Sequence, residues 1–406
     1  MVLGIIAEYN PFHNGHLYHL LKSKEEAKAK TVVAVIGGNF TQRGEPSLVD
    51  KWAKDEMALR NGVDLVLELP TLYSISSAEN FADGAIKILN SLKVVDTVSF
   101  GAETEDLNKL NIIANTLQQE PKDYKDFLSD YLKKGESFPK ARELALVKYL
   151  NDDEYSKIIS SPNNILGIEY LKALKKYSSK ITPICIKRKD AGHLTNEYKG
   201  EIANATTIRK FAFANRMKDV KTYTTPASFT ILQDEMKNGH FVSGLAPFEN
   251  IIIYKLRTMP IEEIAKLPDV SEVLEHLIKK AANSCNTIDD FISIVRSKRY
   301  TETRIRRILL YSLLNVTKKD IDISKKTVPY IRVLGFNENG KHLLSKISRI
   351  NPRLHLITSV KKFENYNINR NLKTILEKDI LATNVYTLGY LNDSQATLDY
   401  TKKLLS

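Results

Sequence analysis

Cysteine, tryptophan and long apolar runs are all scarce in this 406-residue sequence. The two cysteines, Cys185 and Cys285, lie a hundred residues apart and belong to no CxxC pair. Neither a disulfide framework nor a cysteine zinc site is therefore supported, and we expect both to be buried apolar side chains. No run approaches the roughly 20 apolar residues that cross a bilayer, and the first residues lack a basic leader. The sequence predicts a soluble, cytoplasmic protein with no membrane partner.

The distribution of charge differs between the two halves of the chain. Hydrophobic residues make up 43% of the sequence and charged residues 27%, a composition that allows two or three domains with sizeable cores. Residues 1–210 carry 29 basic and 28 acidic side chains, whereas residues 211–406 carry 31 and 20. The surplus in the second half favours a polyanionic partner such as nucleic acid, with a solvated basic face as the alternative.

Short apolar runs alternate with longer helical patterns in the first half of the chain. Runs typical of strands occupy residues 2–7, 31–36, 64–69, 97–100 and 181–186. Several of them end at turn or small polar residues, and the carboxyl ends of parallel strands commonly form a ligand crevice. We predict an α/β fold in which residues 1–215 form a parallel-sheet domain with an active site at that edge.

The second half changes first to helices and then to a mixed pattern. Helical spacing of apolar residues extends over residues 105–150, 166–174 and 225–314. Four prolines lie where helices would begin or end, at Pro226, Pro247, Pro260 and Pro268. Short strands are predicted over residues 330–336, 354–359 and 385–388. These patterns predict a mainly helical region, residues 216–328, followed by a small α/β region, residues 329–406.

A histidine motif directly follows the first predicted strand. It reads Phe12-His13-Asn14-Gly15-His16, and leucines at helical spacing come after it. A helix N-terminus attracts anions, and His13 and His16 would share one face of the first turn. As hydrogen-bond donors they could stabilise the negative charge that moves onto the α–β bridging oxygen of ATP as pyrophosphate leaves. We therefore predict both to be catalytic. The alternatives are capping or core histidines, or half of a metal site, although an acidic third ligand is not nearby.

This motif resembles the HxGH signature of the nucleotidylyltransferase superfamily, which includes class I aminoacyl-tRNA synthetases and cofactor adenylyltransferases. The resemblance implies a later Ser/Thr-rich turn in which a basic residue closes over the phosphates. The segment from Ala203 to Arg209 occupies the expected place, with the Thr206 hydroxyl and the Arg209 guanidinium as ATP-binding groups. An ordinary helix start is the alternative.

A closer resemblance is to the bacterial tRNA(Met) cytidine acetate ligase family. It is carried by residues 7–16, 37–44, 99–103 and 162–167, and it continues to residues 298–304. The resemblance implies that acetate attacks the α-phosphate of ATP, which is expected to enter with Mg²⁺. The acetyl-adenylate would then acetylate N4 of the wobble cytidine in elongator tRNA(Met). By motif, the implied ATP-binding residues are Ala7, Glu8, Tyr9, Asn10, Pro11, Phe12, His13, Asn14, Gly15, His16, Leu17, Tyr18, His19, Leu20, Gly101, Asn163 and Arg188.

Some of these residues also have plain structural interpretations, and the sequence departs from the family at two places. Gly101 could be a turn glycine, Asn163 a helix cap and Arg188 a surface side chain. Many members carry an aromatic-His-Asp run where this chain has Gly192-His193-Leu194, and position 204 is Asn instead of the usual Ser. The glycine-rich segment 37–44 is either a substrate-binding or a mobile loop. Glu8 and Glu103 are interpreted as solvated carboxylates without a catalytic role.

A local basic cluster accompanies the charge surplus of the second half. Against one acid, Glu302, it comprises Arg296, Lys298, Arg299, Arg304, Arg306 and Arg307. Tyr300 offers a face for base stacking, so we predict tRNA contact, with a basic helix face as the alternative. A cofactor adenylyltransferase is the competing function, but it would not need this basic half. A nucleotide-sensing RNA-binding module without catalysis is the third possibility.

Overall fold

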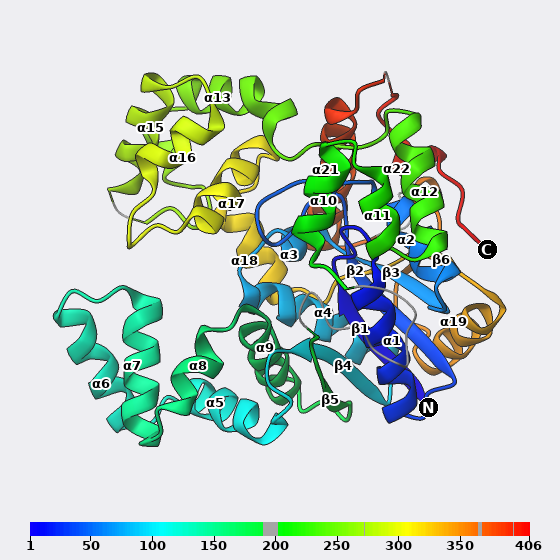
Figure 1. The fold of residues 1–406 in the computed structure, drawn as a ribbon, viewed down its shortest axis with the longest axis horizontal. Helices are drawn as coiled ribbons and strands as arrows, with labels where there is room; N and C mark the ends of the chain where they lie inside the picture. Colours follow the sequence, from blue (N-terminus) through cyan, green and yellow to red (C-terminus); the bar gives the residue numbers. More distant parts are fainter. Residues whose placement is uncertain (190–201, 272, 364–367, 393) are drawn as a thin grey trace.

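A seven-stranded sheet forms the centre of the protein (Figure 1). The computed structural model describes residues 1–189, 202–271, 273–363, 368–392 and 394–406. The strand order is β5-β4-β1-β2-β3-β6-β7. The strands are β1 Val2–Ala7, β2 Thr31–Gly37, β3 Leu65–Leu69, β4 Thr97–Ala102, β5 Thr182–Lys187, β6 Ile331–Phe336 and β7 Leu356–Ile357. The first five strands pair in parallel, as predicted, and β6 runs antiparallel to β3.

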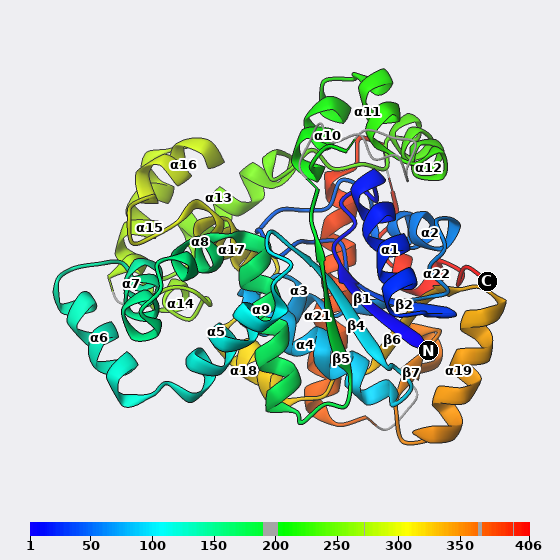
Figure 2. The ribbon, with the colours of Figure 1, turned by 60° about the horizontal axis from the view of Figure 1, so that its bottom comes forward.

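Both faces of the sheet are covered, which explains why its strands are continuous apolar runs. In β2, Val33 and Val35 belong to one core cluster, and Val32 and Ile36 belong to the cluster on the opposite face. Nine helices connect the strands in the first part of the chain. They are α1 Asn14–Glu26, α2 Lys51–Arg60, α3 Thr71–Ser74, α4 Ala78–Leu92, α5 Leu107–Gln119, α6 Lys122–Lys133, α7 Phe138–Leu150, α8 Glu154–Ser160 and α9 Pro162–Lys176. Figures 1 and 2 show α6 and α7 extending away from the sheet.

Among the described residues between β5 and β6, helices predominate, as the spacing over residues 225–314 predicts. The helix α10 Ala205–Phe213 lies before the region predicted at 216–328. The helices of that region are α11 Met217–Tyr223, α12 Pro226–Lys237, α13 Glu249–Thr258, α14 Ile261–Ile264, α15 Leu274–Ser284, α16 Ile288–Val295, α17 Glu302–Leu313 and α18 Lys318–Lys326, with a short 3₁₀ helix at Ala246–Phe248. Pro226 begins α12 and Pro260 directly precedes α14, as expected for a residue that cannot donate within a helix. Figures 1 and 2 show α13, α15 and α16 as a group beside the central sheet.

The C-terminal strands complete the central sheet instead of forming a sheet of their own. The predicted strand at 330–336 is β6, which pairs with β3, and the run at 354–359 contains only the two-residue β7. The prediction of a strand at 385–388 was wrong. Those residues end α21 Arg370–Tyr386 and form the 3₁₀ helix Thr387–Gly389. The remaining helices are α19 Glu338–Ile350, α20 Val360–Phe363 and α22 Leu398–Thr401.

A buried ionic cluster joins the C-terminal helix α22 to the sheet. Lys51 Nζ lies 2.9 Å from Glu68 Oε1 and 2.8 Å from Asp399 Oδ1, and all three side chains are almost fully buried. Burial favours the neutral form of Lys51, but Asp399 and Glu68 outweigh it and raise the lysine pKa. Arg332 also approaches Asp399, at 3.4 Å. The N-terminal and C-terminal parts of the chain therefore contribute charged side chains to the same buried cluster.

Two further predictions concern the burial of the cysteines and the location of the protein. Cys285 is buried as predicted, whereas Cys185 is only half-buried and its Sγ lies 3.2 Å from the carbonyl oxygen of Thr104. Within the described ranges, every helix is too short or too polar to cross a membrane. The cytoplasmic location stays a prediction.

Candidate active site

The histidine motif forms the start of α1, directly after β1. His13 is the N-cap: its Nδ1 accepts a hydrogen bond from the backbone N–H of Gly15 at 3.0 Å. The backbone N–H of His13 donates in turn to Nδ1 of His16 at 3.3 Å. This reciprocal pair is a capping box made of two histidines. Because both Nδ1 atoms are acceptors, each neutral ring carries its proton on Nε2 and presents an N–H donor at the helix start, where His16 also has a backbone hydrogen bond with Pro11.

The environment keeps these rings neutral. His13 and His16 stack with ring centroids 3.8 Å apart, so two positive charges there would repel. Burial, together with the charges of Arg188 and Arg209, lowers the pKa of His13 to about 3. Burial and His13 place the pKa of His16 well below its usual range. Both histidines therefore act as uncharged hydrogen-bond donors at neutral pH.

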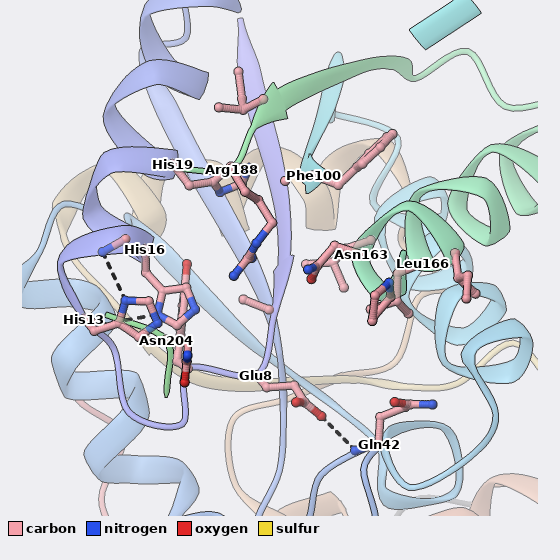
Figure 3. A pocket seen from close by; sticks show the side chains of 18 of the residues that line it. Glu8, His13, His16, His19, Gln42, Phe100, Asn163, Leu166, Arg188 and Asn204 are labelled. Carbon is pink, nitrogen blue, oxygen red and sulfur yellow. Dashed lines mark hydrogen bonds between the residues drawn. The ribbon is translucent and has the colours of Figure 1, made fainter. Parts of the chain in front are cut away.

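A cavity of about 590 Å³ opens in front of this helix start (Figure 3). It lies at the carboxyl ends of β1, β4 and β5 and is also bordered by the first turns of α1, α4, α9 and α17. Its volume is within the range of small-molecule sites. The prediction that the active site lies at the carboxyl edge of the parallel sheet agrees with this position.

Arg188 supplies positive charge on one side of the cavity. The residue follows β5, and its backbone N–H donates to the carbonyl oxygen of Ala102 at 2.8 Å, which extends the pairing of β5 with β4. Gly101 makes room for it, because a Cβ there would lie 3.3 Å from Arg188 Cγ and 3.7 Å from His19 Cδ2. Gly101 therefore positions neighbouring side chains as well as bordering the cavity. Figure 3 shows Arg188 directed between His16 and Asn163.

Glu103 organises the start of α9 on the opposite side. Asn163 Nδ2 donates to Glu103 Oε1 at 2.6 Å, and the backbone N–H of Asn164 donates to Oε2 at 2.9 Å. The side chain of Asn164 accepts from the backbone N–H of Glu103 in return, at 2.9 Å. Asn163 borders the cavity with its orientation fixed. Glu103, which we interpreted as a solvated carboxylate, is thus the cap of this helix.

The apolar part of the cavity contains residues that sequence reasoning missed. Phe81, Phe100, Leu166 and Tyr170 line it together. Phe81 and Tyr170 come from α4 and α9, and both count among the side chains of the main core. In a sequence they are indistinguishable from ordinary buried aromatic residues, so no local signal marks them. They give the cavity a surface suited to a planar or small apolar group.

The glycine-rich loop between β2 and α2 borders the cavity through Gln42 and Arg43. The backbone N–H of Gln42 donates to Glu8 Oε1 at 2.7 Å. Buried Lys54 holds the base of the loop, since its Nζ donates to the carbonyl oxygens of Gly37 and Gly38 and to Ser47 Oγ. Burial lowers the pKa of Lys54 to about 8. The loop is therefore anchored at both ends, which favours the substrate-binding interpretation.

The structure brings most of the predicted nucleotide residues to the cavity, but not all. Those that line it are Ala7, Glu8, Tyr9, His13, Gly15, His16, Tyr18, His19, Gly101, Asn163 and Arg188. The remaining members of the run support the motif from outside the cavity lining: Asn10, Pro11, Phe12, Asn14, Leu17 and Leu20. Phe12 and Leu20, for example, are buried in the core beneath α1. The run is thus partly a binding surface and partly its scaffold.

The predicted second element lies beside the motif. Asn204 caps α10 through the backbone N–H of Thr207 and lines the cavity, whereas Thr206 and Arg209 are not among its lining residues. Arg209 Nη1 donates to the carbonyl oxygen of Asn10 at 3.0 Å, and Nη2 donates to Thr206 Oγ1 at 3.3 Å. Arg209 therefore braces the loop before the helix start. Phosphate contact by Thr206 and Arg209 stays a prediction, and Gly192, His193 and Leu194 lie outside the described residues.

Two groups of side chains make up the basic cluster. Arg296, Lys298 and Arg299 are exposed before α17. Within α17, Arg304 donates to the carbonyl oxygen of Asp269, Arg307 pairs with Asp269 at 2.7 Å, and Arg306 lies 3.2 Å from Glu45. One face of Tyr300 is covered by Arg304, whose Cζ lies 5.1 Å from the ring centroid. Arg296, although exposed, lies 3.5 Å from Glu302, so four of the six predicted tRNA contacts have partners inside the protein.

The β2–α2 loop packs directly on α17. Gly44 has φ +81°, and a Cβ there would lie 2.5 Å from the backbone nitrogen of Arg307, so only glycine fits. Thr303, in the first turn of α17, lines the cavity itself. The cavity and the basic cluster are therefore neighbouring parts of one surface.

Comparison with known proteins agrees with this arrangement. The model of the HIGH Nucleotidyl Transferase family matches residues 1–400. Proteins named tRNA(Met) cytidine acetate ligase from Thermoanaerobacter sp. (strain X514) and Caldanaerobacter subterraneus subsp. tengcongensis are each 49% identical to this chain. The first aligns over 408 residues, 100% of this chain and 99% of the relative; the second aligns over 402 residues, 98% of each.

A solved structure is similar over the whole chain as well. The crystal structure of Thermotoga maritima TmcAL bound with alpha-thio ATP has a TM-score of 0.92 and 35% sequence identity, and the match covers 100% of this chain and 99% of that one. The apo form of the same protein has a TM-score of 0.93 with the same coverage. The chain therefore belongs to the HIGH nucleotidyl transferase family and, within it, to the tRNA(Met) cytidine acetate ligases.

Proposed function

We propose that this protein is an ATP-dependent acetate ligase that forms N4-acetylcytidine at the wobble position of elongator tRNA(Met). The observation that carries the proposal is the pair of neutral histidine donors at the helix start, in a cavity bordered by Arg188. Relatives with the same activity in their name match the full chain, and TmcAL, which matches it in structure, was solved with an ATP analogue.

The first step is the formation of acetyl-adenylate. A carboxylate oxygen of acetate attacks the α-phosphorus of ATP, a new oxygen–phosphorus bond forms, and the bond to the bridging oxygen breaks to release pyrophosphate. His13 and His16 donate from Nε2 to the oxygens on which negative charge increases, and Arg188 adds a fixed positive charge. Neutral donors suit this role, because they bind the leaving anion without the cost of keeping two adjacent imidazolium ions.

Mg²⁺ is expected to enter with ATP. Among the described residues, no three His, Cys, Asp or Glu side chains are grouped as ligands of a metal ion would be. An ion at this site would thus be held mainly by phosphate oxygens and water, which is common for Mg²⁺. The protein residues that complement the phosphate charge are then Arg188 and the two histidines.

The second step needs a site where RNA reaches the cavity. Thr303 connects α17 with the cavity, and the exposed residues Arg296, Lys298 and Arg299 lie just before that helix. Guanidinium and ammonium groups bind RNA phosphates and position the chain without reading its sequence. This adjacency favours an RNA acceptor over the small phosphorylated precursor that a cofactor adenylyltransferase would use.

Acetate-dependent exchange of labelled pyrophosphate into ATP, with and without tRNA, tests the proposal. We expect exchange that requires acetate and proceeds without tRNA, and N4-acetylcytidine when elongator tRNA(Met) is added. Exchange that requires a phosphorylated small molecule instead of acetate would identify the adenylyltransferase. ATP binding without any exchange would identify a nucleotide-sensing RNA-binding module.

A further inference from the structure

Glu8 is the only acidic residue among the described residues that line the cavity. ATP, acetate and pyrophosphate are all anions, so a carboxylate there opposes the reactants of the first step by charge. The acceptor of the second step differs, because an amine gains positive charge as it attacks a carbonyl carbon and must then lose a proton. The charge of Glu8 therefore matches the second step and not the first.

The position of Glu8 leaves one oxygen available. The residue directly follows β1 and is half-buried, and its Oε1 accepts the hydrogen bond from the backbone N–H of Gln42. Within the described part of the chain, its Oε2 accepts no hydrogen bond. Figure 3 shows the Glu8 side chain on the Gln42 side of the cavity, apart from His13 and His16. The carboxylate is thus anchored by one oxygen and open at the other.

Two cations lie near Glu8 and donate their hydrogen bonds to other groups. Lys54 and Arg209 both interact with it electrostatically. The three Nζ–H groups of Lys54, however, donate to two carbonyl oxygens and a hydroxyl. Arg209 donates to Asn10 and Thr206. The Glu8 carboxylate thus lies in reach of a ligand, beside two cations whose hydrogen bonds are made to other groups.

The histidines of the cavity are not available as bases. Nδ1 of His13 and of His16 accepts a backbone hydrogen bond, and Nε2 of each ring already carries the proton. Nε2 of His19 lies 3.1 Å from Ser99 Oγ, and that ring also makes a hydrogen bond with the backbone of Phe100. Arg43, Lys187, Arg188 and Lys189 are cations. Among the described lining residues, Glu8 is the side chain that has an oxygen open to accept a proton.

We propose that Glu8 is the catalytic base of acetyl transfer and binds the acceptor amine through its open oxygen. The lone pair of the cytidine N4 attacks the carbonyl carbon of acetyl-adenylate and forms the carbon–nitrogen bond. The bond from that carbon to the phosphate oxygen breaks, and AMP leaves with the electron pair. The N4 proton passes to the Glu8 carboxylate and from there to water. This inference rests on the proposed function and assigns Glu8 a role separate from ATP binding.

Glu8→Gln is the informative variant, because the glutamine Oε1 can still accept from the N–H of Gln42 while the base is removed. Acetate-dependent pyrophosphate exchange should fall much less than transfer to tRNA, and hydroxylamine should still trap the acetyl group, because it is a strong nucleophile that needs no enzyme base. Single-turnover transfer from preformed acetyl-adenylate to tRNA should fall by about a hundredfold or more, the scale for losing a general base. Glu8→Ala should lose transfer as well.

The outcomes separate this inference from others. Glu25→Gln, a surface change at the far end of α1, should leave both steps unchanged. If Glu8→Gln transfers acetyl at the wild-type rate, the inference is wrong while the proposed function stands. If it loses exchange and transfer equally, Glu8 serves ATP or Mg²⁺ and is not the acceptor base. If the wild-type protein forms acetyl-adenylate but never acetylates RNA, the proposed function fails and this inference fails with it.

Discussion

His13 and His16 stack at the start of α1, with ring centroids 3.8 Å apart and each Nδ1 bound by a backbone N–H. The same two hydrogen bonds that begin the helix also fix the tautomer of each ring. The donors that we propose for catalysis are therefore oriented by the local fold before any substrate arrives. Preorganised donors of this kind avoid reorganisation when charge moves to the leaving group.

The lowered pKa of His13 predicts that the protein loses stability in acid. The unfolded histidine takes up a proton below its ordinary pKa of 6.5, whereas the folded one stays neutral until the pH approaches about 3. Its contribution is therefore complete above pH 6.5 and is lost as the pH falls, by up to about 1.4 kcal/mol per pH unit. His13→Asn keeps a capping side chain, and its free energy of unfolding in urea should fall less steeply below pH 6.5. Parallel pH curves for the two proteins would contradict this account.

Replacing Thr206 and Arg209 by Ala should weaken the use of ATP. Arg209 braces the carbonyl oxygen of Asn10, and it lies 3.6 Å from Glu45, so its loss loosens the loop before His13 even without a phosphate contact. Acetate-dependent pyrophosphate release should fall while tRNA affinity persists. ATP kinetics identical to wild type in the folded double variant would show that the second element lies elsewhere, with Lys187, Arg188 and Lys189 as the nearest candidates.

The two groups of basic residues should behave differently. Changing Arg296, Lys298 and Arg299 to Ala should weaken tRNA binding and spare acetyl-adenylate formation. The slope of log affinity against log salt should become shallower by about 0.7 to 0.9 for each RNA phosphate that the variant no longer binds. An unaltered affinity and salt slope would make this segment a solvated basic face.

Arg307→Ala is the matched comparison within the same cluster. Its guanidinium side chain is 11% exposed and pairs with Asp269, so the change should lower stability by leaving Asp269 uncompensated. Its direct effect on the salt slope of tRNA binding should be small. If the Arg307→Ala protein is as stable as wild type and its tRNA affinity depends less steeply on salt, Arg307 binds RNA after all.

Lys51→Met should destabilise the whole protein. The change leaves Glu68 and Asp399 as buried carboxylates without their shared lysine, and breaking a buried ion pair from one side costs about 3–5 kcal/mol. Urea unfolding measures the loss, and Lys266→Met, on the surface, is the control. A loss of stability no larger than that of the control would show that the cluster does not hold α22 to the sheet.

The parts of the fold that sequence predicts well are those decided locally. The five parallel strands are continuous apolar runs, and α1 begins where a strand meets a capping motif. Pairing of β6 with β3 is a contact between residues about 270 positions apart, and no local pattern indicates it. The run at 385–388 has the apolar composition of a strand, but Tyr386 completes the buried face of α21 and donates to the carbonyl oxygen of Ser47. Tertiary packing decided that segment.

In the candidate site, too, the sequence predicts the residues that belong to a local motif and misses those that distant parts of the chain bring in. His13, His16 and Gly15 were predicted because motif and helix start coincide in the sequence. The internal partner of Arg307 is Asp269, 38 residues earlier, so a charge count could not separate this arginine from exposed Arg299. Phe81 and Tyr170 reach the cavity from helices that also fill the core, and their sequence context is that of core residues.

The central claim is that acetate is activated at the histidine helix start, and acetate-dependent pyrophosphate exchange in His13→Ala and His16→Ala tests it most directly. With folding verified and the exposed His276→Ala as control, each motif variant should lose about a hundredfold or more of exchange, the effect of removing one preorganised donor. The His276 variant should match wild type. Near wild-type acetyl-adenylate formation in both folded motif variants would contradict the account and place the activation step elsewhere in the protein.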